Sequence, residues 1–150
     1  TGGLLGFRET RRIRGEYILS NEDYDSRASF EDEIGRYCYP IDLHPIAPGA
    51  EKSQYEENYR KGYGKGNSYG IPYRCLLPQD TVNLLVAGRC ISTSREMNGS
   101  TRVMPCCFIT GMAAGAAAAM AKDSSPREIS VPELQKNLKK MGAYLPHTAL

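Results

Sequence analysis

The sequence lacks a hydrophobic run long enough to cross a bilayer. Its longest apolar stretch, Phe108–Ala121, consists mostly of Ala, Gly and Met and is shorter than the roughly 20 residues that a spanning helix needs. The sequence also lacks a strong charge of either sign, because the formal net charge is +2. A charge this small argues against electrostatic capture of nucleic acid or of an anionic membrane, so we expect neither among the partners.

The cysteines lack the even number and the regular spacing of a disulfide framework. There are five, with no C-x-x-C pair, so a zinc centre or a redox pair of that type is excluded and we expect no metal site. A bridge between the neighbours Cys106 and Cys107 would be strained. These features favour reduced thiols in a cytoplasm-like compartment, although the localisation is otherwise open.

Neither an initiator methionine nor a signal peptide opens the chain, which starts TGGLLGFRET. The composition, 41% hydrophobic and 24% charged, is typical of a globular protein. The apolar residues are nevertheless unevenly distributed, and only Val82–Ala87 and Phe108–Ala121 are rich enough to anchor a core. We therefore expect a fragment of a longer protein.

The first half of the sequence predicts strands joined by polar segments. A strand pair is expected around Arg14–Gly15, a short acidic helix within Ser20–Ile34, and a two-faced strand within Gly35–Pro48. Asp42 and His44 share one face of that last strand, as in proton-transfer pairs and also in ordinary exposed faces. The tyrosines and basic residues of residues 49–70 indicate a surface flap or, as an alternative, a stacking platform for single-stranded nucleic acid.

The central stretch, Thr81–Lys122, has the order strand, loop, helix start. All residues of Val82–Ala87 except Asn83 are apolar, so both alternating sets of side chains are apolar. This pattern is typical of a strand buried on both faces. Gly88 then permits a turn or a close approach that a side chain would block. This order is a common way to hold a phosphate or a polar cofactor ring.

The helix after this loop is predicted to begin at Pro105. Its first turn would leave the N–H groups of Cys106, Cys107 and Phe108 free, and these groups and the helix dipole would form a site for a negative group. The alanines and glycines that follow allow close packing, so an alternative is a core helix without a ligand. A last helix is expected from the cap at Ser130 to Gly142, with an apolar stripe for packing.

Six segments together resemble the C-terminal flavin-binding part of bacterial FAD-dependent oxidoreductases, which are broadly similar to flavoproteins with a glutathione-reductase-like FAD fold. Three carry the flavin-binding motif and three resemble the stretches that precede it in that family. The segments are NLLVAGRCIS (Asn83–Ser92), GSTRVMPCC (Gly99–Cys107), TGMAAGAAAA (Thr110–Ala119), RETRRIRGEYIL (Arg8–Leu19), YPIDLH (Tyr39–His44) and IPYRCLLP (Ile71–Pro78).

The resemblance implies an α/β protein of which this chain is an α+β fragment. Residues 1–80 would belong to a substrate-facing domain, and residues 81–150 would supply the last strand and helix of an FAD-binding domain and a C-terminal helix. The Gly-x-Gly-x-x-Gly unit that holds the FAD pyrophosphate is absent from this sequence. The missing N-terminal portion of the same protein is therefore an expected partner, the fragment alone is expected to be inactive, and a homo-oligomer is possible through its apolar surface.

The resemblance also implies hydride transfer between a small organic substrate and FAD. Candidates for lining the active site are Asp42, His44 and Arg74. The positions implied to lie nearest the cofactor are Gly88, Arg89, Ser100, Arg102, Met104, Pro105, Cys106 and Cys107.

Three questions stay open at this point. Arg95 stands where relatives often have histidine, and a guanidinium cannot take over a proton-transfer role. Cys106 and Cys107 would form a redox pair only if the helix start made them reactive. An alternative function is a non-catalytic interaction module that keeps the outline of the fold and binds no flavin.

Overall fold

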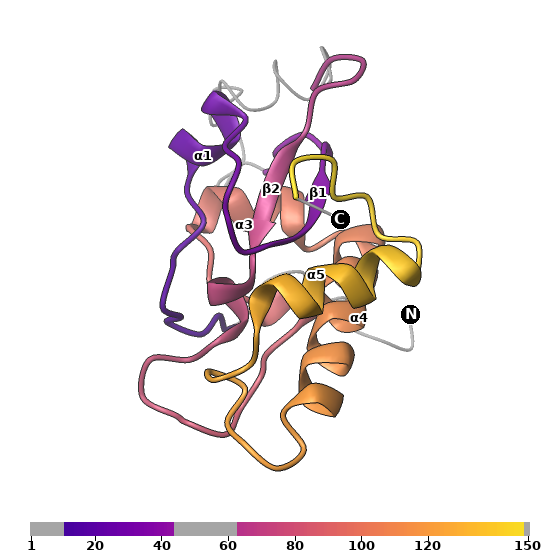
Figure 1. The fold of residues 1–150 in the computed structure, drawn as a ribbon. Helices are drawn as coiled ribbons and strands as arrows, with labels where there is room; N and C mark the ends of the chain where they lie inside the picture. Colours follow the sequence, from indigo (N-terminus) through magenta and orange to yellow (C-terminus); the bar gives the residue numbers. More distant parts are fainter. Residues whose placement is uncertain (1–10, 44–62, 149–150) are drawn as a thin grey trace, which may run out of the picture.

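The computed structural model describes residues 11–43 and 63–148. These residues form a mixed structure of helices and one small two-stranded sheet, compatible with an α+β fold (Figure 1). In chain order the elements are α1 (Asn21–Ser26), β1 (Glu33–Tyr37), β2 (Tyr69–Pro72), the 3-10 turns η1 (Tyr73–Leu76) and η2 (Gly88–Cys90), α3 (Arg95–Thr101), α4 (Met104–Met120) and α5 (Val131–Lys140).

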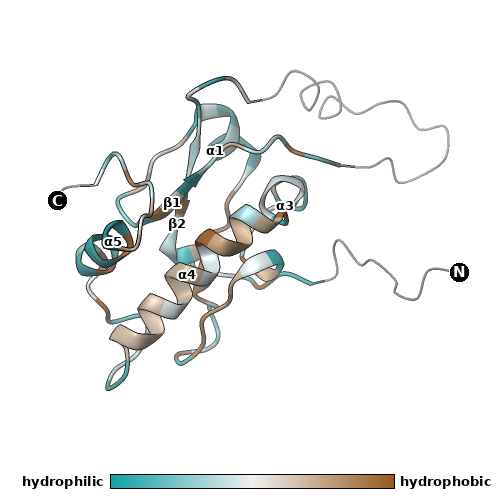
Figure 2. Cartoon of the chain, turned by 90° about the vertical axis from the view of Figure 1, so that its right-hand side faces the viewer, coloured by the Kyte–Doolittle hydropathy of each residue, from teal (hydrophilic) through white to brown (hydrophobic). Residues whose placement is uncertain are grey.

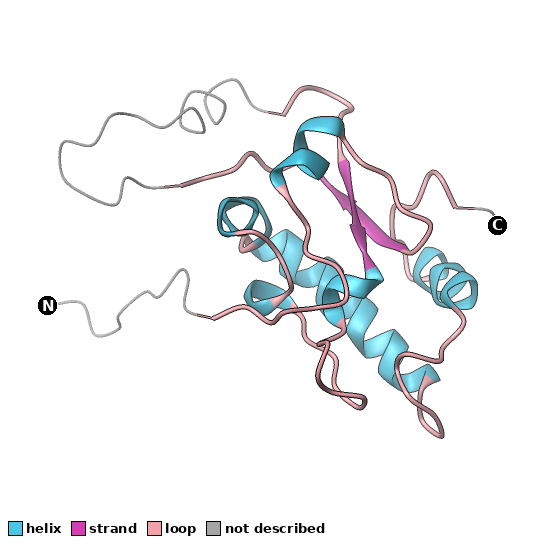
Figure 3. Ribbon diagram, turned by 90° about the vertical axis from the view of Figure 1, so that its left-hand side faces the viewer, coloured by secondary structure: helices cyan, strands magenta, loops and turns pink. Residues whose placement is uncertain are grey.

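The sheet is an antiparallel pair of short strands against which α4 and α5 pack (Figure 3). Gly35 pairs with Ile71 and Tyr37 with Tyr69, with an irregularity between Glu33 and Gly35. Gly35 has a structural reason to be glycine, because a Cβ there would lie 2.5 Å from Cγ2 of Ile109. The bare backbone of β1 therefore lies directly on α4.

The core beside this sheet is built largely from tyrosines. The rings of Tyr24 and Tyr63 are 4.5 Å apart, and the fully buried ring of Tyr69 contacts both of them and Tyr37. Such tilted and edge-on pairs are favourable arrangements of aromatic rings. Tyr63 and Tyr69 belong to the segment considered for stacking on nucleic acid, and their burial removes them from that role.

Three of the four α-helices in the described ranges begin with serine caps; those at Ser20 and Ser130 were predicted, whereas α3, with its cap at Ser94, forms where the sequence analysis expected a loop. Ser20 forms a capping box with Asp23 at α1, Ser94 accepts from the Met97 N–H at α3, and Ser130 caps α5. The acidic helix and the last helix are therefore confirmed. Leu134 and Leu138 of α5 are buried, whereas Met141, placed in the same stripe from the sequence, is 57% exposed at the end of the helix.

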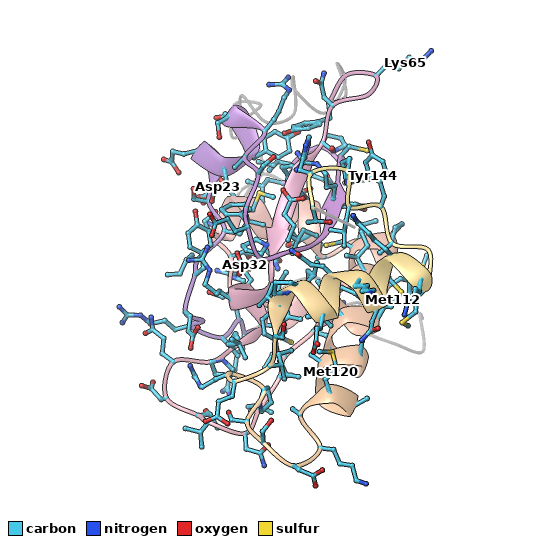
Figure 4. The ribbon with its side chains drawn as sticks, viewed as in Figure 1. Asp23, Asp32, Lys65, Met112, Met120 and Tyr144 are labelled. Carbon is cyan, nitrogen blue, oxygen red and sulfur yellow. The ribbon has the colours of Figure 1, made fainter. Side chains whose placement is uncertain are left out.

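Helix α4 differs sharply in composition from its neighbour α5. Its sequence, MPCCFITGMAAGAAAAM, contains no charged residue, and Figure 2 shows white and brown along α4 where α5 is largely teal. Met112 and Met120 of α4 lie beside α5 (Figure 4), and the Asn137 Nδ2 is 3.6 Å from the Met120 sulfur. The helix begins at Met104, one residue before the predicted start, so Pro105 occupies its second position.

Several predicted strands do not form in the described part of the chain. The pair expected around Arg14–Gly15 is reduced to two isolated bridges, Gly15 to Pro78 and Leu19 to Thr93. The strand expected within residues 35–48 forms at residues 35–37, as the end of β1; residues 38–43 are not in a strand, and the rest of that range lies outside the described residues.

Val82–Ala87 is likewise irregular instead of a strand buried on both faces, with Val82 71% exposed and Leu84 46% exposed. The described residues provide no strand alongside it, and an apolar run becomes a buried strand only when neighbouring strands complete its hydrogen bonds.

Candidate functional site

The site begins at the N-terminus of α4, where no side chain caps the helix. Val103 is the N-cap residue, the first turn contains no acidic residue, and Met104 is 71% exposed. An uncapped helix start carries a partial positive charge toward the solvent. Within the described ranges, the other three α-helices direct a serine oxygen at this position, so α4 is set apart from them.

The free N–H groups predicted at this helix start are not all available, which is a correction to the sequence analysis. The Cys106 and Cys107 N–H groups both donate to the Val103 carbonyl, at 3.0 and 3.2 Å. Pro105 has no N–H to offer. The helix start therefore attracts negative charge through its dipole, without the row of free donors that the sequence suggested.

The two neighbouring cysteines lie in different environments. Cys106 is fully buried, and burial raises the pKa of its thiol far above the usual range. Cys107 is half-buried; burial raises its pKa, and the positive charge of Arg89 opposes that rise. Burial thus favours the protonated form of both thiols, which argues against the activated-thiolate interpretation of this pair.

The turn η2 lies against the first turns of α4. Gly88 has φ +72°, a backbone conformation that favours glycine, and its N–H donates to the Thr110 Oγ1 at 2.9 Å. The Arg89 side chain is exposed, while its carbonyl accepts from the Asn98 Nδ2 at 3.2 Å. Thr110 and Asn98 were missed by the sequence analysis: Thr110 is a polar residue within the predicted apolar helix, which is a signal that could have found it, whereas Asn98 lies in α3, which was not predicted.

The structure brings together two of the predicted site residues, Asp42 and Arg102. The Arg102 Nη2 donates to the Asp42 carbonyl at 2.8 Å and lies 3.4 Å from its Oδ2. Gly99 makes this approach possible, because a Cβ on it would lie 2.9 Å from the Asp42 carbonyl oxygen. Arg102 precedes the uncapped start of α4 by two residues, so this ion pair lies at the site.

Ser100 has a different place from the one predicted. Its side chain is buried in the core, where its Oγ lies 2.6 Å from the Tyr69 hydroxyl and donates to the Tyr39 carbonyl at 2.5 Å. Burial raises the pKa of Tyr69 well above its ordinary value. This hydroxyl therefore connects α3 to the sheet, and its hydrogen bonds are made inside the protein.

Arg74 makes its contacts in another part of the structure. Its Nε and Nη2 donate to the Asp32 carboxylate at 3.0 and 3.2 Å, and its guanidinium lies over the Tyr17 ring at 5.1 Å (Asp32 is labelled in Figure 4). The hydrogen bond to Asp32 raises the pKa of Arg74. Arg74 is thus committed to Asp32, while Arg102 holds Asp42, and His44 lies outside the described residues.

The described residues contain neither a metal-binding cluster nor a single membrane-spanning helix. No group of three or more His, Cys, Asp or Glu side chains there is arranged to hold a metal ion. No single described helix is long and apolar enough to cross a membrane; α3 and α4 together reach that length and composition, but they are bent by 91°.

Comparison with known proteins identifies a family. The family model described as FAD dependent oxidoreductase matches residues 1–138. No curated protein and no solved structure matches this sequence.

Proposed function

We propose a function on the basis that the chain belongs to the FAD dependent oxidoreductase family. It supplies the flavin-ring side of the cofactor site in an enzyme that passes hydride between an organic substrate and FAD. FAD is the cofactor of this family, so the protein is a flavin oxidoreductase. The observation that carries the finer proposal is the uncapped, positively polarised start of α4 beside Arg89 and Arg102.

The residues at this helix start fit a ring that carries negative charge on one edge. The first turn of α4 has no acidic side chain, and Met104 and Pro105 are exposed, so a flat group has access to the helix end. Gly88 adds no side chain to the turn beside it. The helix dipole contributes about 0.3–1 kcal/mol to holding a negative group. Bound FAD supplies the hydride chemistry, and these residues supply binding, orientation and charge stabilisation.

On the substrate side we propose that Asp42 is held in place by Arg102. The guanidinium contacts both the backbone carbonyl and the carboxylate of Asp42, which fixes the residue next to the helix start. His44 follows two residues later and is kept as a candidate for proton transfer. Arg74 is kept as a candidate for the rim of the substrate site, where its bond to Asp32 would have to be exchanged for a substrate contact.

We further propose that the N-terminal dinucleotide-binding portion of the same protein covers the open face of α4. We use this name for the exposed residues of the helix, which are Met104, Pro105, Phe108, Gly111, Gly115, Ala118 and Ala119. Phe108 is 71% exposed on this face, and the helix carries no charge that would favour contact with water. A second copy of the chain is the other partner considered, and a cytoplasmic location agrees with the free cysteines.

The experiment that tests the proposal is production of the full-length protein that contains this sequence. We expect a yellow protein with the absorption bands of oxidised flavin, which lose their intensity when substrate or a chemical reductant is added. A colourless, well-folded protein that takes up no FAD on reconstitution would show the alternative, a non-catalytic interaction module that binds no flavin.

A further inference from the structure

The turn η2 is fastened to the rest of the protein at each of its three residues. Its first N–H donates to the Thr110 Oγ1 at 2.9 Å, its second carbonyl accepts from the Asn98 Nδ2 at 3.2 Å, and its last carbonyl accepts from the Ile13 N–H at 2.9 Å. Thr110 and Asn98 are both buried. A three-residue turn held in this way has little freedom to move its backbone.

Thr110 is the connection between this turn and α4. Its hydroxyl lies 3.0 Å from the Cys106 carbonyl and 3.2 Å from the Cys107 carbonyl, so its single proton is donated back into the helix. Because a hydroxyl has one proton and two lone pairs, its oxygen still accepts the Gly88 N–H. Valine would keep the shape of this side chain but would leave that N–H without an acceptor.

The charged side chain that the turn presents is Arg89, next to the exposed Cys90. Its charge counteracts the effect of burial on the pKa of Cys107, so the guanidinium acts on the first turn of α4. A Cβ at Gly88 would lie 3.7 Å from the Cys107 Sγ, which confirms how closely the turn and the helix approach. The position of the Arg89 cation relative to the helix start thus depends on the backbone of η2.

We propose that Thr110 is a positioning residue of the cofactor site: it holds η2 against α4 and so places the Arg89 guanidinium beside the helix start, where the negative edge of the flavin is bound. This inference rests on the proposed function and adds to it a residue that does not itself contact the cofactor. Arg89 is the residue through which Thr110 acts.

The test compares Thr110→Val and Thr110→Ser in the full-length protein. Thr101→Val is a matched control, because Thr101 is also a buried helical threonine whose hydroxyl donates to the carbonyl four residues before it, Met97, at 3.3 Å. The first measurement is amide hydrogen exchange of the peptide that contains Gly88, without added FAD. We expect faster exchange in Thr110→Val and unchanged exchange in Thr110→Ser and Thr101→Val.

The second measurement is the dissociation constant of FAD, with the shape of the bound flavin absorption band. We expect Thr110→Val to weaken binding about tenfold, the effect of one lost hydrogen bond of ordinary strength, and to shift the band. Thr110→Ser restores both, and Thr101→Val changes neither. Arg89→Gln should weaken binding to the same degree, and adding Thr110→Val to it should cause little further loss.

The failure of this inference and the failure of the proposed function give different results. A wild-type protein that takes up no FAD overturns the proposed function, and this inference with it. A wild-type protein that binds FAD while Thr110→Val binds it equally well overturns the inference alone. If Thr110→Val does not fold, Arg89→Gln decides, because an exposed side chain is replaced there and unchanged FAD affinity would overturn the placement of Arg89.

Discussion

Buried polar side chains determine how the segments of this protein meet. Ser100, Thr110 and Gln135 each form a hydrogen bond with a residue distant in sequence. Gln135 donates to the carbonyls of Glu31 and Glu33, which lie 104 and 102 residues earlier. A polar residue in a predicted helix is normally assigned to the exposed face, and nothing in its local pattern reveals its distant partner. Among the described residues selected from the sequence for the site, Asp42 and Arg102 form an ion pair, and the Cys107 Sγ donates to the Arg102 carbonyl at 3.8 Å.

The first prediction at the residue scale concerns the thiols. Cys38 and Cys90 are exposed, Cys107 is half-buried, and Cys75 and Cys106 are buried, with burial raising the pKa of the Cys75 thiol to about 12. A thiol reagent should therefore label Cys38 and Cys90 within minutes, Cys107 more slowly, and the last two only after unfolding. Peptide mapping by mass spectrometry at timed intervals checks this order. Rapid labelling of Cys106 in the folded protein would contradict the burial described for it.

The second residue-scale prediction concerns Gly88 and Pro105 in the full-length protein. Gly88→Val places a β-branched residue at φ +72°, which costs roughly 1–2 kcal/mol, so the turn beside the helix start should distort and the flavin content should fall. Pro105→Asp adds a carboxylate to the positive start of α4, where it competes with a negative ligand. The flavin-to-protein absorbance ratio measures both effects. The exposed Glu133→Ala serves as the control, and equal flavin content in all three variants would refute the site.

Two of the three serine-capped helices were predicted from their end signals, and the short α3, capped by Ser94, was not. Helices α1 and α5 begin at the expected serines, and the left-handed Gly142, φ +95°, follows the end of α5. Helix α4 was also predicted, with an error of one residue at its start. Val82–Ala87 was not, because a strand depends on neighbours as well as on its own residues, and the described residues supply none beside it.

At the scale of the element, two helical glycines should respond in opposite ways to the same substitution. A Cβ on Gly99 would lie 2.9 Å from the Asp42 carbonyl oxygen, so Gly99→Ala should destabilise the protein by about 1–3 kcal/mol. A Cβ on Gly115 would meet no atom within 4 Å, so Gly115→Ala in this chain should stabilise it by about 0.5–1 kcal/mol. Urea unfolding of the two variants measures the difference.

The sign of the stability change caused by Gly115→Ala also tests whether another part of the protein covers the open face of α4. In the full-length protein, a domain packed closely on that face would meet the added methyl group, and the substitution should become neutral or destabilising. The same gain of stability in the chain and in the full-length protein would show that no other part of the protein packs there.

For the molecule as a whole, we predict a loss of stability at alkaline pH. Burial raises the pKa of Cys75 from 9.0 to about 12, and those of Tyr63 and Tyr73 from 10.0 to about 12. The folded protein thus holds these protons more tightly than the unfolded chain. Their contribution to the free energy of unfolding is complete below pH 9 and is lost as the pH rises from about 9 to 12. Each group lowers that free energy by about 1.4 kcal/mol per pH unit between its pKa in the unfolded chain and its pKa in the folded protein.

Urea unfolding at several pH values, with tyrosine ionisation followed by absorbance, measures this loss. Cys75→Ala is a useful comparison, because it removes one of the titrating groups and should reduce the slope between pH 9 and 10. A free energy of unfolding that stayed constant up to pH 11 would contradict the burial of these side chains.

The family and the cofactor of the whole protein were predictable because they depend on motifs spread over most of the sequence. The spatial arrangement was less so. The sheet of two short strands joins residues 33–37 to residues 69–72, and its register depends on Gly35 lying against Ile109 and Gly70 against Glu33. These are contacts between distant segments, for which the periodicity of one segment gives no evidence.

The amide of Gln135 determines when this fold can be completed during synthesis. It donates to the Glu31 carbonyl at 2.7 Å and to the Glu33 carbonyl at 3.0 Å, and the second bond spans 102 residues. Arg127 similarly bonds the Thr81 carbonyl, 46 residues earlier. The start of β1 therefore leaves the ribosome long before its last hydrogen-bond donor exists. At about 5–20 residues per second, several seconds pass between the synthesis of β1 and that of Gln135, so the start of the strand waits that long for its last hydrogen bonds.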